Sequence, residues 1–170
     1  MENPLNKIYE TLQTLTGLHR QLLETVRVER TAIIDADLRA IHQITATKQD
    51  LVEKIRLTEN ERLKFTTELA VLWKKPLRDL TLPNIIIAIQ GEDSKGADQL
   101  RSIHNTLTVL IQRITDQNSN NLVLIERSLE HVNAMKKNVL GESAPASGTY
   151  TQSGQKTSSS SSSRLFSGEA

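Results

Sequence analysis

Aliphatic residues recur at alternating steps of three and four along most of this chain, and this spacing restricts the folds open to it. One series consists of Leu5, Ile8, Leu12, Leu15, Leu22, Val26 and Ile33, with His19 and Glu29 in its two gaps. A second series consists of Leu38, Ile41, Leu51, Ile55, Phe65, Leu69 and Leu72, with Lys48, Thr58 and Arg62 on the same stripe. Such a stripe is typical of a helix that packs along its whole length against other helices. Polar residues at these positions usually set the register of the packing.

Residues 35–37 (Asp-Ala-Asp) separate the two series, and they either cap the second helix or only bend a continuous one. Pro76 and Pro83 mark a break after the second helix, because proline disfavours helix at the residue before it. For the isoleucine-rich stretch from Thr81 to Gln90 we predict a short helix with Thr81 as its N-cap. A strand is the alternative, but no second strand is available to pair with it. Residues 91–96 are predicted to form a turn.

The last helix is predicted over roughly residues 98–140. Its first apolar series consists of Leu100, Ile103, Leu107, Leu110 and Ile114. Near Asn118 the register is predicted to slip by one residue, and Ile125, Leu129, Val132 and Val139 continue on a shifted stripe. The predicted fold is therefore all-α, an elongated antiparallel bundle of three long helices plus one short helix.

The composition changes abruptly after residue 140. Residues 141–170 are rich in serine and glycine and poor in apolar residues, so they cannot bury enough surface to offset their ordering entropy. We predict a helical domain over residues 1–140 and a disordered tail over residues 141–170, in which the six-serine run is a flexible linker.

Composition also limits the function. The chain has no cysteine, which excludes disulfides and thiolate zinc sites, and its net charge of +1 argues against a nucleic-acid partner. The longest apolar run, residues 85–89, is too short to cross a membrane, and the N-terminus lacks the pattern of a signal peptide. We therefore expect a cytoplasmic protein with no membrane insertion.

Catalytic motifs are not found in the sequence. None of the four histidines follows a glutamate at the Glu-x-x-His spacing of di-iron bundles, and no phosphate loop or nucleophile elbow occurs. His19 lies on a core stripe, where a hydrogen-bonded interior histidine is the expected role. A histidine phosphotransfer bundle using His104 or His131 is an alternative, but neither is followed by the Lys-Gly pair usual in those domains. We expect no enzyme activity, no metal and no cofactor.

Three asparagines, Asn118, Asn120 and Asn121, stand just ahead of an apolar stripe, although asparagine is a poor residue for the interior of a helix. A structural interpretation is that they specify pairing, or tolerate exposure where the bundle splays. A functional interpretation is that the stripe beyond them is unsatisfied and binds another amphipathic helix. The residues of that stripe are Leu122, Ile125, Leu129, Val132 and Met135.

Two stretches carry a resemblance to a known family: LLETVRVERTAIIDADLRAIHQITATKQDLVEKI in the first half, and NSNNLVLIERSLEHVNAM followed by a lone Tyr150 with Gly154. Over residues 20–154 the chain resembles the FlgN family of flagellar type III export chaperones. The resemblance implies a cytoplasmic helical protein that binds the C-terminal helical segments of the hook-filament junction proteins FlgK and FlgL. Such a protein would prevent their premature assembly and deliver them to the export gate protein FlhA.

The resemblance also implies site residues. The expected cargo-binding residues are Asn118, Asn121, Leu122, Ile125, Leu129, Val132 and Met135. Tyr150 and Gly154 would dock to the export gate; without the resemblance, Tyr150 would be an incidental aromatic in a tail. The serine-rich extension beyond Gly154 departs from the family pattern. The competing function is a structural or regulatory module that self-associates through the same stripe, for instance as a homodimer.

Overall fold

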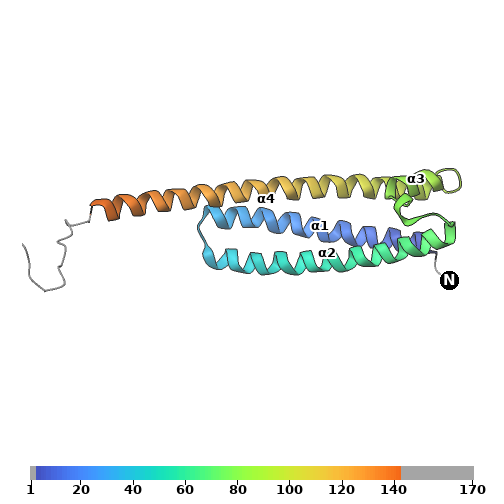
Figure 1. Ribbon diagram of the computed structural model, residues 1–170, viewed down its shortest axis with the longest axis horizontal. Helices are drawn as coiled ribbons and strands as arrows, with labels where there is room; N and C mark the ends of the chain where they lie inside the picture. Colours follow the sequence, from blue (N-terminus) through green and yellow to red (C-terminus); the bar gives the residue numbers. More distant parts are fainter. Residues whose placement is uncertain (1–2, 143–170) are drawn as a thin grey trace, which may run out of the picture. The chain divides into compact units, whose positions relative to one another are not determined.

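The computed structural model describes residues 3–142, and their side chains up to residue 140 (Figure 1). Three long α-helices, one short α-helix and a single 3-10 turn make up this part of the chain, and it contains no strand. The elements are α1 (Pro4–Ile34), α2 (Leu38–Trp73), η1 (Leu77–Asp79), α3 (Leu82–Ile89) and α4 (Ser94–Glu142). The all-α prediction, with three long helices and one short one, is confirmed. The predicted disordered tail lies outside the described residues, apart from the end of α4.

The chain divides into two compact units, Met1–Ser128 and Leu129–Ala170. The first unit contains α1, α2, η1, α3 and most of α4. The described part of the second unit is the last portion of α4. Helix α4 continues to Glu142, and the residues that follow lie outside the described part, so the domain boundary that we expected after residue 140 stays a prediction.

Side-chain caps define where the helices begin. The carboxylate of Asp37 accepts a hydrogen bond from the Ala40 amide at 3.0 Å, so residues 35–37 separate two helices rather than bend one. Thr81 caps α3 as predicted, with its hydroxyl 3.4 Å from the Asn84 amide. Helix α4 begins at Ser94, earlier than the predicted residue 98, because Asp93 accepts from the Gly96 amide at 2.8 Å. The predicted turn at residues 91–96 is therefore wrong in its second half.

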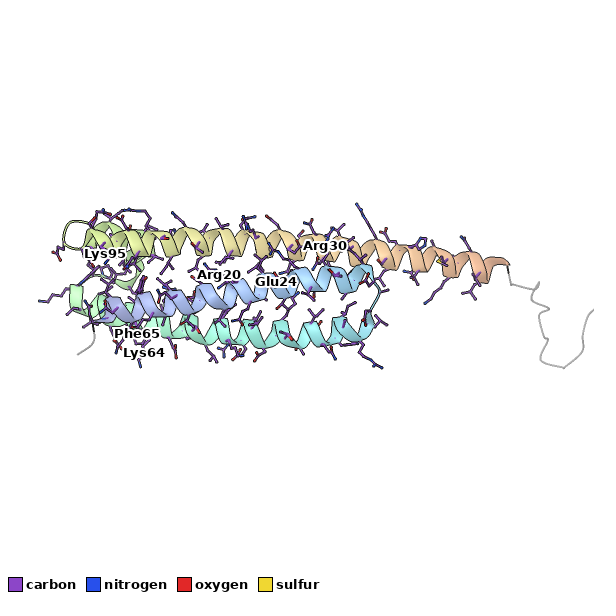
Figure 2. The ribbon with its side chains drawn as sticks, turned by 180° about the vertical axis from the view of Figure 1, so that it is seen from behind. Arg20, Glu24, Arg30, Lys64, Phe65 and Lys95 are labelled. Carbon is purple, nitrogen blue, oxygen red and sulfur yellow. The ribbon has the colours of Figure 1, made fainter. Side chains whose placement is uncertain are left out.

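Within the first unit, α2 runs antiparallel to α1, and α4 lies alongside α1 (Figure 1). Residues from α1, α2, the loop after η1, α3 and α4 form one cluster, which we call the apolar core. Its buried members are Ile8, Leu12, Leu15, Leu69, Ala70, Leu80, Ile85, Ile86, Ile89, Ala97, Leu100 and Leu107. Phe65 of α2 packs against this cluster near the start of α1 (Figure 2), with the Lys7 ammonium 5.3 Å from the ring centroid. Short α3 thus contributes three isoleucines to the same core as the long helices.

Two members of the second predicted series are exposed rather than packed in the core. Leu38 and Leu72 are exposed. Leu38 is the first residue of α2, directly after its cap, and Leu72 lies next to the last residue, Trp73. Trp73 packs against the apolar core in place of Leu72. The periodic pattern holds in the middle of α2 and fails at its first and last turns, where the chain reverses.

Candidate functional site

The core-facing stripe of α4 continues past Ile114 without a slip in register. Leu100, Leu107, Ile114 and Asn121 are spaced seven apart, and all four are buried. The predicted slip near Asn118 therefore holds for the apolar residues, which continue on a shifted and exposed face, but not for the buried face of the helix. Polar residues take over the buried positions of α4, while the apolar residues move to a neighbouring face.

The buried polar positions belong to a network that joins three helices. Lys48 of α2 lies 3.0 and 2.8 Å from the two carboxylate oxygens of Glu29 on α1, and it also donates to the Asn118 side-chain oxygen at 3.1 Å. The Lys48 and Glu29 side chains are 24% and 13% exposed. The Lys48–Glu29 ion pair is therefore mostly buried, and the Asn118 side-chain amide is hydrogen-bonded to it.

Asn121 completes the network from α4. Its side-chain nitrogen donates to the Val26 carbonyl and to Glu29 Oε2, both at 3.0 Å, and its oxygen accepts from Gln117 at 3.1 Å. Its side chain is only 2% exposed. We call Glu29, Lys48, Gln117, Asn118 and Asn121 the polar layer. Among the described residues, no buried side-chain nitrogen or oxygen lacks a partner.

A satisfied polar layer of this kind mainly specifies register. Replacing a buried ion pair with well-packed apolar residues is often neutral or stabilising, so such a layer is weak support for stability. Removing one partner leaves the others buried and unpaired, which costs about 1–3 kcal/mol for each hydrogen-bonding group. Asn118 and Asn121 therefore have a role inside the bundle, as the structural interpretation of the asparagines proposed. In this conformation the Asn121 amide is not at the surface, and its part in cargo binding stays a prediction.

From Leu122 onward, α4 carries a series of exposed apolar side chains. We call Leu122, Ile125, Leu129, Val132 and Met135 the α4 stripe; all five are exposed, Leu122 to 56%. Leu122 and Ile125 belong to the first unit, and the other three belong to the second. Within each unit, their spacing of three or four residues is that of side chains on one side of a helix. Contiguous exposed apolar side chains with this spacing are typical of a surface that binds another helix.

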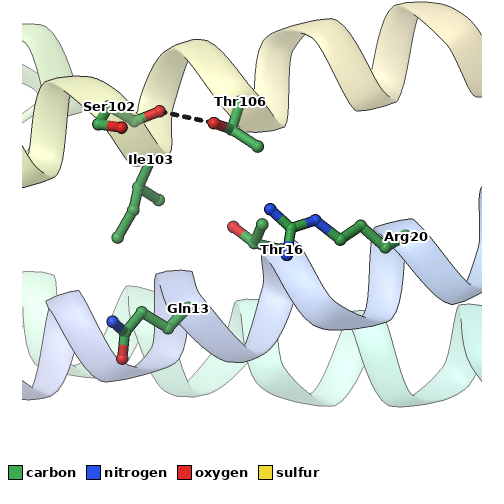
Figure 3. Close-up of a pocket in the computed structure, with 6 residues that line it drawn as sticks. All are labelled: Gln13, Thr16, Arg20, Ser102, Ile103 and Thr106. Carbon is green, nitrogen blue, oxygen red and sulfur yellow. Dashed lines mark hydrogen bonds between the residues drawn. The ribbon is translucent and has the colours of Figure 1, made fainter.

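Two further grooves lie between the helices of the first unit. A pocket between α1 and α4 has Arg20 extending toward Thr16, while the Thr106 hydroxyl donates to the Ser102 carbonyl of its own helix (Figure 3). None of its lining residues is an acid, a histidine or a cysteine, so it contains no general base or thiol nucleophile. A second groove, lined mainly by residues of α2, α3 and α4, includes Glu59 and His104 together with the exposed Leu63 and Ile111.

Histidines and acidic residues do not converge in the described region. The His19 ring lies 2.7 Å from the Leu15 carbonyl of its own helix, and His131 is exposed. No group of three or more histidines, cysteines or acidic residues that could hold a metal ion occurs within residues 3–140. Likewise, none of the described helices is long and apolar enough to cross a membrane.

Sequence reasoning identified the α4 stripe but missed the polar layer as a unit. Glu29 and Lys48 were recognised as polar residues on apolar stripes, and that position was the available signal. Their partners on α4 depend on which turns of three helices lie at the same level, which no single stripe specifies. Tyr150 and Gly154, the predicted gate-docking residues, lie outside the described residues.

Comparison with known proteins places the chain in a protein family. A search of curated proteins and a search of solved structures each find nothing similar. The FlgN protein family, in contrast, matches residues 1–158, which is most of the chain. The chain therefore belongs to the FlgN family of flagellar export chaperones.

Proposed function

We propose that this chaperone binds the C-terminal helical segments of the hook-filament junction proteins FlgK and FlgL through the α4 stripe. The supporting observation is the stripe itself, five exposed apolar side chains at helical spacing on one helix. We expect these cargo segments to carry an apolar helical face that would otherwise pair with a neighbouring subunit. A chaperone that covers such a face with its own apolar stripe prevents premature assembly.

The expected affinity is moderate. Full burial of a large aliphatic or methionine side chain contributes about 1.5–3 kcal/mol. Association costs roughly 4–15 kcal/mol in lost freedom, so five such side chains leave a limited surplus. A limited surplus suits a carrier, because the export gate must be able to remove the cargo. Met135 adds an unbranched, adaptable side chain that fits more than one cargo surface.

Delivery is the second half of the proposal. Tyr150, with Gly154 nearby, would dock to the export gate protein FlhA in the cytoplasm. A single tyrosine combines a large apolar ring with a hydroxyl, and it can anchor a weak, reversible contact. Under this assignment, Tyr150→Ala lowers the affinity for FlhA and leaves the affinity for FlgK and FlgL unchanged.

The test is an isothermal titration of the full chain with the C-terminal helical segments of FlgK and FlgL. Val132→Asp is compared with Val109→Asp, because these two valines lie on the same helix and are 47% and 49% exposed. We expect the first change to weaken binding by about tenfold or more, equivalent to 1.4 kcal/mol. The second should leave binding unchanged, because Val109 is not on the stripe.

Circular dichroism of both variants supplies the control. Unchanged helicity in Val132→Asp, together with lost binding, supports a surface role for the stripe. Unfolding would indicate a core residue instead. If the unmodified chain binds neither segment but sedimentation finds a dimer that Val132→Asp dissociates, the stripe is a self-association surface and the proposal is wrong.

A further inference from the structure

Helix α4 buries an asparagine and exposes the leucine next to it. Asn121 is buried, while Leu122 and Ile125 are exposed, although all three lie in the first unit. Successive residues of an α-helix are about 100° apart around its axis. A local rotation by one residue would therefore bring Leu122 toward α1 and α2 and turn Asn121 outward. The hydrophobic effect alone favours that exchange.

The surface that faces α4 opposes this rotation. Asn121 contacts the Val26 carbonyl and Glu29, and Asn118 contacts Lys48. If Leu122 took the place of Asn121, the Val26 carbonyl would lose its side-chain donor, and Glu29 would lose a neutral partner. The same rotation would turn Asn118 away from Lys48. A polar group buried without a partner is unfavourable, and a buried charge is more so. Between Ile114 and the half-buried Leu124, the buried and half-buried positions of α4 are all polar, so the polar layer decides which face is buried over these two turns.

We infer that Glu29 and Lys48 are positioning residues: they hold Asn121 in the seam and thereby keep Leu122 and Ile125 out of the protein's own core and available to a partner helix. The inference rests on the proposed function for its purpose, but the placement of Leu122 and Ile125 can be measured without any cargo. Buried polar groups that fix register at some cost in stability are well attested in helical assemblies.

A thiol reporter tests the placement. The chain has no cysteine, so Ile125→Cys introduces a single thiol whose reaction rate with a maleimide follows the exposure of that position. The test variant is Glu29→Leu with Lys48→Leu, which makes the facing surface apolar. The conservative variant is Glu29→Gln with Lys48→Gln, which keeps hydrogen-bonding groups. The matched control is Glu53→Leu with Arg56→Leu, because that acid–base pair lies on the same α2 helix as Lys48 and is exposed.

We expect the leucine pair to slow the thiol reaction by about tenfold or more while helicity is retained, as a shift of the buried face requires. The glutamine pair and the surface control should react within about twofold of the parent. Because the leucine pair could fail to fold, Asn121→Ala provides a second variant: it frees α4 from Val26 and Glu29 without burying a new charge. Asn121→Ala should also slow the thiol reaction, but by a smaller factor than the leucine pair. An unchanged or faster reaction in folded leucine-pair and Asn121→Ala proteins would overturn the inference.

Titration with the FlgK segment, in proteins that keep Ile125, separates the two proposals. The leucine pair should lower the apparent affinity by the same factor as the thiol rate, because only the fraction with an open stripe can bind. If the unmodified chain binds no segment, the proposed function fails, yet the thiol rates still decide the positioning role. If the thiol slows and binding is unaffected, Glu29 and Lys48 orient the helix but the inference about partner access is wrong.

Discussion

The two ends of the first unit bury different kinds of side chain. Where α3 packs against the long helices, the buried side chains are mainly aliphatic, among them Ile8, Leu15, Leu69 and Ile85. Near the turn between α1 and α2, the buried contacts to α4 are an ion pair and two amides. Aliphatic packing supplies stability but accepts many alternative arrangements. Hydrogen bonds with fixed partners supply less stability and accept few arrangements.

The difference fits a division of roles along α4. Its first half must stay in place, and it lies against the apolar core through Ala97, Leu100 and Leu107. The part around Asn121 must keep a particular face turned inward, so that the apolar residues of the next face stay exposed. A bundle with leucine at both places would be free to bury the surface that we assign to its partner.

The largest effect is expected at the aliphatic end. Leu15 is fully buried in the apolar core, and Leu15→Ala should reduce the free energy of unfolding by about 2–5 kcal/mol. Urea denaturation followed by circular dichroism measures this. Leu57→Ala, at an exposed position of α2, is the matched control and should stay within about 0.5 kcal/mol. Equal losses at the two positions would mean that the apolar core is not where the stability of the bundle resides.

A smaller loss is expected at the polar end. Glu29→Ala leaves Lys48 without its counter-ion and removes one acceptor from Asn121, so we expect a loss of about 1–3 kcal/mol in the free energy of unfolding. Glu24→Ala removes a carboxylate from the same helix, but its partner Arg27 and Glu24 itself are exposed, so the loss should be about 0–1 kcal/mol. If Glu29→Ala were as harmless as Glu24→Ala, the polar layer would be an ordinary surface network.

The smallest expected effect is the pH dependence of the exposed Glu53–Arg56 ion pair, which contrasts with the buried pair of the polar layer. Arg56 donates two hydrogen bonds to Glu53, at 2.8 and 2.7 Å, and these bonds hold the pKa of Glu53 below its ordinary value of 4.5. Because the pKa is lower in the folded state, the contribution of this pair is present above pH 4.5 and is lost as the pH falls through the folded pKa. A carboxyl carbon NMR titration should place the pKa of Glu53 closer to 4.5 in Arg56→Gln. The same pKa in both proteins would show that the pair does not form in solution.

Much of the fold was predictable because the apolar spacing records which face each helix buries. The series from Leu5 to Val26 and from Leu100 to Ile114 are buried or half-buried as expected. The predictions that failed have one cause: the apolar spacing of one helix does not indicate where another helix lies against it. Leu38 and Leu72 continue a stripe beyond the point where another helix is available. Asn121 is buried because Val26 and Glu29 offer partners for its amide, and these lie far away in the sequence.

Hydrogen–deuterium exchange of the full chain, free and with the FlgK C-terminal segment bound, tests the central claim most directly. Binding along the α4 stripe should slow exchange in residues 122–140 and leave α1 and α2 unchanged, because a helix whose apolar face is covered opens less often. Slower exchange confined to α1 or α2, with residues 122–140 unaffected, would contradict the account and place the cargo elsewhere on the bundle.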